Sequence, residues 1–295
     1  MNKNESSLIG FTLLTQASVG IISTFLILNL IFPAALLPFE TGFSAFSPDL
    51  LALILLAVAA SLSFLHLGKP QHASNVFNNL KSSWLSREIA GLILYGTVLL
   101  ALVYVRITGI QNEMLTEGIL VFALISGLLL VFFMSKIYMV GTIPSWNSAF
   151  TWQSFYLSAF ILGSIFTLFF IKTSIDLAEN DKHSQMIILS GILMMLLIFE
   201  SISLLTWYLH LINLRSATPL KPDFNNRKFL QPHVIRALLI VGSSIISAYI
   251  FYGLKAGENS KDISYFPFIL LLLTVIIGEI LNRWLFYKSY FRVGV

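Results

Sequence analysis

Two titratable residues, His66 and Glu88, stand at the ends of long apolar segments, where side chains can handle protons at the edge of an apolar layer. His66 is followed by Gly68 and Pro70, which predict that a helix stops there. An imidazole accepts a proton near neutral pH, and a histidine beside a carboxylate is a common proton-handling unit. Glu88 opens the next apolar segment, so we expect the two side chains to flank one pocket.

Both residues also have a simpler interpretation. His66 is suited to cap its helix by hydrogen bonding to a loop carbonyl. Glu88 is suited to the first turn of a helix whose N-cap is Ser86, because a carboxylate there complements the helix dipole. From the residues alone, the capping roles and the proton-handling roles both stay open.

Four further residues are candidates to line the same pocket. Trp84 and Arg87 precede Glu88, and Lys136 lies near the end of a later apolar segment, from which its long side chain can reach the interface. Gln16 lies inside the first apolar segment. An amide in that position can also join helices by hydrogen bonding.

Three more ionisable residues, Glu200, Glu279 and His210, are candidates for a proton path, because such residues are costly in lipid. Glu279 comes four residues before Arg283, so we expect these two side chains to share a helix face and form an ion pair. Glu200 has no sequence-local partner, and a protonated carboxyl group in a helix contact is the alternative to a proton path. His210 and His233 are expected near the membrane interface.

The elements that must position these residues follow from the composition. Of the 295 residues, 57% are hydrophobic and 11% are charged, and the mean hydropathy is +0.84. A soluble domain has about 25% charged residues, and a bilayer-spanning helix needs roughly 20 apolar residues. We therefore predict an all-α integral membrane protein that binds no nucleic acid, with one domain over residues 1–295 forming a bundle of eight transmembrane helices. The eight apolar runs are 8–32, 47–66, 88–106, 114–139, 149–171, 185–211, 232–254 and 264–287.

No metal site is predicted within the protein. It has no cysteine, which excludes thiolate-ligated iron–sulfur clusters and disulfides. Its five histidines fall at helix ends or in loops, so we expect no haem, which needs facing histidines within the membrane. If electrons pass through this protein, a partner must carry the metal.

An even number of helices places both termini on one side. That side holds every Lys and Arg except five of the 18, and the net charge of +4 is expected to belong to loop ends. The positive-inside rule then predicts cytoplasmic termini. The five tryptophans also fall on that side, as an aromatic belt or as a surface where something docks. The five Lys and Arg residues on the other side are Arg106, Lys172, Lys182, Lys255 and Lys261.

One block of the sequence resembles the DmsC family, the membrane anchor subunits of dimethyl sulfoxide reductase. It reads His66-Leu67-Gly68-Lys69-Pro70, then Asn75 and Asn78, then Leu85-Ser86 and Glu88-Ile89-Ala90. Supporting agreement runs from end to end of the sequence. It comprises Glu5, Phe11-Thr12, Gln16, Gly20, Tyr138, Pro144, Trp146, His210, Gly278-Glu279, Arg283 and Phe286-Tyr287.

The resemblance implies a subunit of a three-part respiratory reductase in the cytoplasmic membrane of a bacterium or archaeon. A molybdopterin catalytic subunit and a four-cluster iron–sulfur subunit would complete it. The family's anchor oxidises menaquinol, passes two electrons to the nearest iron–sulfur cluster and carries no haem. Its histidine and glutamate linked to quinol binding map onto His66 and Glu88.

The sequence departs from the family at His72 and Lys136, where the family has arginine, and Glu200 has no counterpart. The family's usual orientation places the termini outside, opposite to the charge asymmetry. Three other functions stay open: a polysulfide-reductase-type quinone-linked anchor, a secondary transporter and a purely structural anchor. Unbroken helices with polar residues at one interface argue against the transporter. The terminal electron acceptor is a choice of the catalytic subunit.

Overall fold

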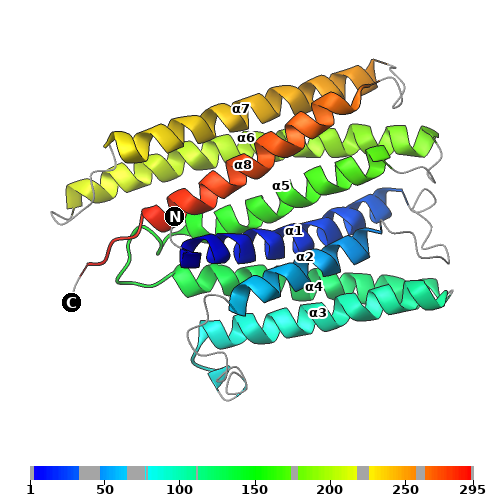
Figure 1. Ribbon diagram of the computed structural model, residues 1–295, viewed down its shortest axis with the longest axis horizontal. Helices are drawn as coiled ribbons and strands as arrows, with labels where there is room; N and C mark the ends of the chain where they lie inside the picture. The colour runs from blue at the N-terminus through cyan, green and yellow to red at the C-terminus, as the bar shows by residue number, and fades with distance from the viewer. Residues whose placement is uncertain are drawn as a thin grey trace.

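The computed structural model describes residues 3–32, 47–64, 77, 79–110, 112–173, 179–217, 226–256 and 263–293. Within this part of the protein, eight α-helices run back and forth as a bundle (Figure 1). They are α1 (Lys3–Ile31), α2 (Pro48–Phe64), α3 (Trp84–Thr108), α4 (Glu113–Tyr138), α5 (Ala149–Thr173), α6 (Glu179–Ala217), α7 (Arg227–Lys255) and α8 (Tyr265–Lys288).

The predicted all-α membrane fold is confirmed, and each of the eight apolar runs corresponds to one helix. Seven of the helices in the described residues are long and apolar enough to cross a membrane. The eighth, α2, is apolar but has 17 residues. Its described part ends at Phe64, two residues before His66.

Several helices extend beyond the ends that hydropathy predicted. The longest, α6, has 39 residues, because its helical hydrogen bonding continues into polar residues at both ends. His183, expected in a loop, therefore lies on α6. The start of α3 is also earlier than expected, and its N-cap is Ser83, whose side chain accepts a hydrogen bond from the Ser86 backbone N–H. The prediction that Ser86 is the cap is wrong.

Helix α1 is the centre of the bundle and packs against α2 and α5, with further contacts to α4 and α8. At the α1–α5 crossing the backbones meet at Gly20 and Gly163, where a Cβ atom on either residue would overlap the partner's backbone. Small residues allow such close approach in membrane helices. In Figure 1, α3 and α4 lie on one flank of this pair, and α6, α7 and α8 lie on the other.

The beginning of α1 and the end of α8 lie at the same end of the bundle, which we call the terminal end (Figure 1). The ammonium group of Lys288 lies 3.2 Å from the Glu5 carboxylate there. The expectation that the charge belongs to loop ends is wrong for Arg236 and Arg283, which are buried within α7 and α8. Arg106 is also buried but lies in the last turn of α3, as expected.

Candidate functional site

Glu88 lies buried in the second turn of α3, with 7% of its surface exposed. Because α3 starts at Trp84 and its first turn holds no acidic residue, the dipole-capping interpretation of Glu88 is wrong. Its carboxyl group makes no hydrogen bond or ion pair to any residue in the described part of the protein. A buried carboxyl group without such a partner is costly, which makes Glu88 a candidate for a ligand-binding or proton-handling role.

The neighbouring Arg87 does not neutralise Glu88. Its guanidinium donates to the carbonyl oxygens of Leu80 and Lys81, at 2.8 and 2.7 Å, and lies 4.1 Å from the centre of the Trp84 ring. Arg87 is therefore held on the connection before α3. Of these two neighbouring charged residues, Glu88 is therefore the one that lies on the buried face of α3.

The predicted neighbours Trp84 and Lys136 are brought together by aromatic rings of α4. The Trp84 ring contacts Phe132 and Phe133, at centroid distances of 6.1 and 6.3 Å. The Lys136 ammonium lies 5.4 Å from the centre of the Phe132 ring. These residues form one cluster between the terminal ends of α3 and α4, which cation–π contacts of this kind stabilise.

A pair of tyrosine hydroxyl groups faces the Glu88 region from α4 and α8. The hydroxyl oxygens of Tyr138 and Tyr287 lie 3.0 Å apart, and both interact electrostatically with Glu88. Trp146 fixes this corner, because its indole N–H donates to the Phe286 carbonyl at 2.8 Å. These residues match the family pattern, but none of them was predicted to lie in the site.

His66, the other half of the predicted pair, lies outside the described residues, as does His72. The His66–Glu88 pocket therefore stays a prediction. Of the residues predicted for that pocket, the structure describes Glu88, Trp84, Arg87, Lys136 and Gln16.

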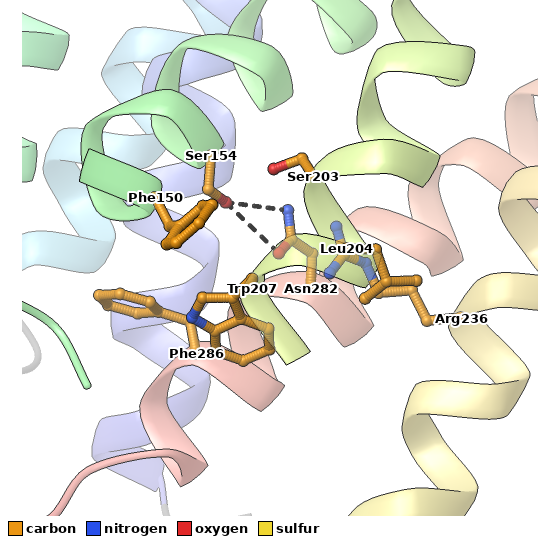
Figure 2. Close-up of a pocket in the computed structure, with 8 residues that line it drawn as sticks. All are labelled: Phe150, Ser154, Ser203, Leu204, Trp207, Arg236, Asn282 and Phe286. Carbon is orange, nitrogen blue, oxygen red and sulfur yellow. Dashed lines mark hydrogen bonds between the residues drawn. The ribbon is translucent and has the colours of Figure 1, made fainter. Parts of the chain in front are cut away.

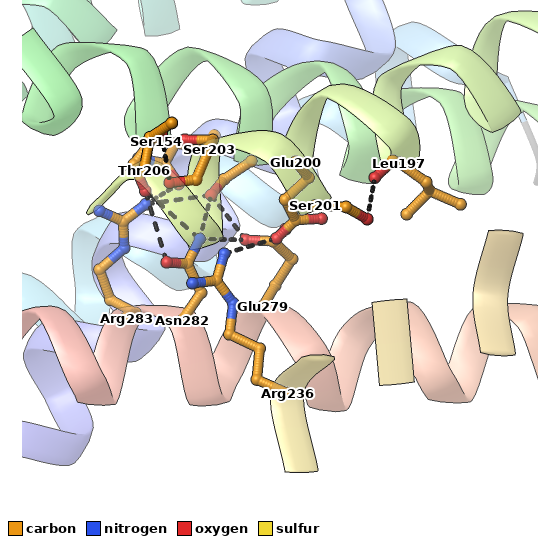
Figure 3. A network of polar contacts seen from close by, with 12 residues as sticks. Ser154, Leu197, Glu200, Ser201, Ser203, Thr206, Arg236, Glu279, Asn282 and Arg283 are labelled. Carbon is orange, nitrogen blue, oxygen red and sulfur yellow. Dashed lines mark hydrogen bonds and ion pairs between the residues drawn. The ribbon is translucent and has the colours of Figure 1, made fainter. Parts of the chain in front are cut away.

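A second polar centre lies between α5, α6, α7 and α8 (Figure 3). Nη2 of Arg236 lies 2.7 Å from Oε1 of Glu200, and both side chains are about 95% buried. Glu200 therefore has an ion-pair partner on α7, which the spacing of residues along the sequence does not predict. One feature of the sequence could have indicated this partner, because Arg236 falls inside the predicted helical run 232–254 rather than in a loop.

The predicted ion pair between Glu279 and Arg283 is wrong. Glu279 Oε2 accepts hydrogen bonds from Ser158 at 2.6 Å and from Asn282 at 3.1 Å. Nη2 of Arg283 donates to Ser158 at 3.2 Å and to Gln16 at 2.9 Å. The two charged groups share a helix face as expected, but the Ser158 hydroxyl of α5 stands between them and bridges them.

Gln16 therefore serves as a joint between α1 and α8, the more ordinary of its two predicted roles. The Arg283 guanidinium also lies 3.9 Å from the centre of the Phe155 ring. Its Nε and Nη1 atoms have no hydrogen-bond partner in the described residues. Arg283 is fully buried, which is rare for a charged side chain and is found where a network compensates it.

A small cavity of about 20 Å³ adjoins this network on its side toward the terminal end (Figure 2). Arg236, Asn282, Ser154 and Ser203 provide its polar lining. Ser154 and Asn282 are hydrogen bonded to each other across its wall. The apolar lining consists of Phe150, Leu204, Trp207 and Phe286.

His210 is not part of the network. It lies beside Phe150, at a ring-centroid distance of 5.4 Å, and near the Pro144 carbonyl. His233, expected at the interface, is 5% exposed and packs among Trp207, Tyr208 and Phe229. It borders a mostly apolar groove of about 250 Å³ between α6 and α7. Within the described residues no group of three or more metal-ligating side chains is present.

Seven long apolar helices in the described residues define a multi-pass integral membrane protein. The sequence profile of the family described as DMSO reductase anchor subunit (DmsC) matches residues 1–288. The protein belongs to the DmsC family. It is thus the membrane anchor subunit of a dimethyl sulfoxide reductase, in the bacterial inner membrane.

Three relatives agree with this assignment. The YnfH protein of Escherichia coli, an anaerobic dimethyl sulfoxide reductase subunit, is 25% identical over 226 residues, 68% of this protein and 78% of the relative. The C subunit of the same organism's anaerobic dimethyl sulfoxide reductase is 25% identical over 248 residues, 82% of this protein and 80% of the relative. The corresponding C subunit from Haemophilus influenzae is 30% identical over 165 residues, 55% of this protein and 56% of the relative. No solved structure matches this sequence.

Proposed function

We propose that this anchor oxidises menaquinol and passes two electrons to a four-cluster iron–sulfur subunit, which delivers them to a molybdopterin catalytic subunit. The observation that carries the proposal is Glu88, a buried carboxyl group without a hydrogen-bond partner among the described residues. It lies within electrostatic range of the Tyr138–Tyr287 hydroxyl pair at the terminal end of the bundle. A carboxyl group in such a site can accept a proton from a bound hydroquinone.

In the proposed mechanism the quinol headgroup enters from the lipid beside α3. His66 accepts a hydrogen bond from one hydroxyl group and takes its proton as the electrons leave. Glu88 orients His66 or takes the second proton. Trp84, Arg87 and Lys136 line the approach, and apolar helix surfaces hold the isoprenoid tail, which needs little specificity.

Every electron and proton released by quinol oxidation has an acceptor in this mechanism. Oxidation of one quinol to quinone releases two electrons and two protons. The electrons go to the nearest cluster of the iron–sulfur subunit, because this protein has no cysteine to hold a cluster. The protons go to side chains of the anchor, and two acceptors are required.

The test compares two activities of the purified complex. Glu88→Gln keeps the shape of the side chain and removes its ability to take a proton. We expect quinol-dependent turnover to fall by about 10² or more, while turnover with an artificial dye as electron donor stays at the wild-type level. His66→Ala is expected to give the same split. Glu117→Gln, on an exposed part of α4 far from the site, is the matched control.

Equal loss of both activities in Glu88→Gln would contradict the proposed role. The complex itself is tested by purifying the tagged protein in mild detergent. Two further polypeptides together with molybdenum, iron and acid-labile sulfide are expected to co-purify. An anchor that elutes alone and free of metal from intact membranes would leave the proposed function without an electron acceptor.

A further inference from the structure

Four charged side chains, Glu200, Arg236, Glu279 and Arg283, meet inside the bundle and are not used by the site at Glu88 (Figure 3). Their exposed fractions are 4%, 4%, 2% and 0%. With both carboxyl groups ionised, the two negative and two positive charges cancel. One added proton leaves a single excess positive charge, which two carboxyl groups and the surrounding hydrogen bonds share.

The two carboxyl groups of the cluster contact each other. Glu200 reaches across from α6 and Glu279 from α8, and the two side chains interact directly. Arg236 binds Glu200, while Ser158 and Asn282 bind Glu279. Two carboxyl groups in contact commonly share one proton.

The hydrogen bonding of the cluster is incomplete within the described residues. The Nε atom of Arg236 has no partner in the described residues, although this side chain is about 95% buried. It borders the cavity in Figure 2, together with Ser154, Ser203 and Asn282. A cavity of about 20 Å³ with several polar walls can hold one water molecule.

Arg283 couples this cluster electrostatically to the Glu88 region. Ser158 accepts from Arg283 and donates to Glu279. Arg283 also interacts electrostatically with Tyr287 and Tyr138, two hydrogen-bonded hydroxyl groups that in turn interact electrostatically with Glu88. These groups belong to α3, α4, α5 and α8, and the cluster extends from them to α6 and α7.

We propose that Glu200 and Glu279 form an internal proton-holding pair, completed by one water molecule bound in the cavity beside Arg236, which accepts a proton released when quinol is oxidised at Glu88. The proposal rests on the proposed function. His66 and Glu88 are the first acceptors of the two protons. One of these protons then moves along the Tyr138–Tyr287 pair and Ser158 to the carboxyl pair. The bound water passes it on toward the terminal end.

The test uses Glu200→Gln in the whole complex. Glutamine keeps an oxygen that accepts from Arg236, so the variant is expected to assemble. We expect quinol-dependent turnover to fall at least about tenfold, less than for Glu88→Gln, with dye-dependent turnover unchanged. Two further readouts move only if a proton is handled here. The solvent deuterium isotope effect on quinol turnover rises, and the infrared band of a protonated carboxyl group disappears from the quinol-minus-quinone difference spectrum.

Glu279→Asp keeps a carboxyl group and is expected to retain more turnover than Glu279→Gln. Ser203→Val places an apolar side chain in the lining of the cavity, keeps both carboxyl groups, and is expected to slow quinol turnover with a raised isotope effect. Glu200→Gln with wild-type turnover, isotope effect and infrared spectrum would overturn the proposal. So would a Ser203→Val variant with an unchanged isotope effect, should Glu200→Gln fail to assemble. If Glu88→Gln loses quinol turnover and Glu200→Gln does not, the proton transfer to the carboxyl pair is wrong and the proposed function stands. If Glu88→Gln keeps wild-type quinol turnover, the proposed function itself is wrong.

Discussion

Nη2 of Arg283 lies 2.9 Å from Oε1 of Gln16, a hydrogen bond between residues 267 positions apart that joins the last helix to the first. Both side chains are fully buried. The bond joins α8 to the central helix α1 at Arg283, one of the four charged residues of the buried cluster. It gives the buried Gln16 amide, in the middle of α1, a partner inside the bundle.

Replacing Gln16 by leucine removes one of the two acceptors of Arg283 Nη2 and leaves one of its buried N–H groups unpaired, while the bond to Ser158 remains. We expect the complex to lose about 1–3 kcal/mol of stability, seen as a lower midpoint in thermal unfolding. Quinol turnover per assembled complex should stay near the wild-type value, because the Gln16 carbonyl is already engaged by Arg283. If Gln16→Leu instead raises the KM for quinol and lowers quinol turnover, Gln16 belongs to the quinol site.

The Glu200–Arg236 pair predicts a strongly non-additive pair of substitutions. Arg236→Met leaves Glu200 buried beside Glu279 without its counter-charge, which costs about 3–5 kcal/mol. Adding Glu200→Gln removes the uncompensated charge, so the double variant should recover most of the lost stability. Thermal unfolding of the three variants gives the coupling energy. A double variant as unstable as the sum of the singles would show that the two residues act independently.

The α1–α5 contact predicts opposite effects for one substitution at two glycines. Gly20→Ala places a Cβ atom into the backbone of α5 at Ala159, so helices must separate. We expect loss of about 1–3 kcal/mol or failure to assemble. Gly242→Ala is the matched control on α7, where a Cβ meets nothing within 4 Å. There alanine's higher helix propensity should be neutral or stabilising. Equal stability of the two variants would contradict the close packing at Gly20.

The eight helices and the candidate role of Glu88 could be predicted from the sequence. The polar contacts around Glu279, Arg283, Glu200 and Arg236 could not. Apolar length gives helices directly, because the bilayer forces backbone groups to pair within a segment. Pairing between side chains depends on how helices rotate against each other. Spacing therefore suggested Glu279 with Arg283, whereas packing of α5 placed Ser158 between them. Arg236 was visible inside a predicted helix, but only the α6–α7 packing identifies Glu200 as its partner.

The Tyr138–Tyr287 hydroxyl pair predicts a graded effect on turnover. Tyr287→Phe removes one of the two hydroxyl groups that interact electrostatically with Glu88 and Arg283, and it preserves the aromatic contacts with Trp146 and Phe286. We expect slower quinol turnover, by a few fold, with unchanged dye-dependent turnover. Tyr249→Phe, exposed on α7, is the control. A Tyr287→Phe variant that matches this control would exclude the hydroxyl pair from proton transfer.

The position of all these groups predicts where the protons of quinol emerge. Glu88 lies in the second turn of α3, and Glu279 lies nine residues before the end of α8. That is about 14 Å from the terminal end, less than half of a membrane about 30 Å thick. In the described residues of the far half, the Arg106–Asp49 ion pair at 2.8 Å stands apart from the network. We therefore expect both protons to be released on the side of the two termini.

The measurement uses vesicles that contain the reconstituted complex, with a C-terminal tag whose protease sensitivity reports its orientation. Ferricyanide on the side of the tag accepts electrons without protons, and pH dyes on the two sides follow proton release. Two protons per quinol on the tagged side agree with the prediction. Glu117→Gln should behave like the wild type. Protons appearing on the opposite side would mean that a route crosses the far half of the bundle, and the Arg106–Asp49 pair would then be the first place to search for it.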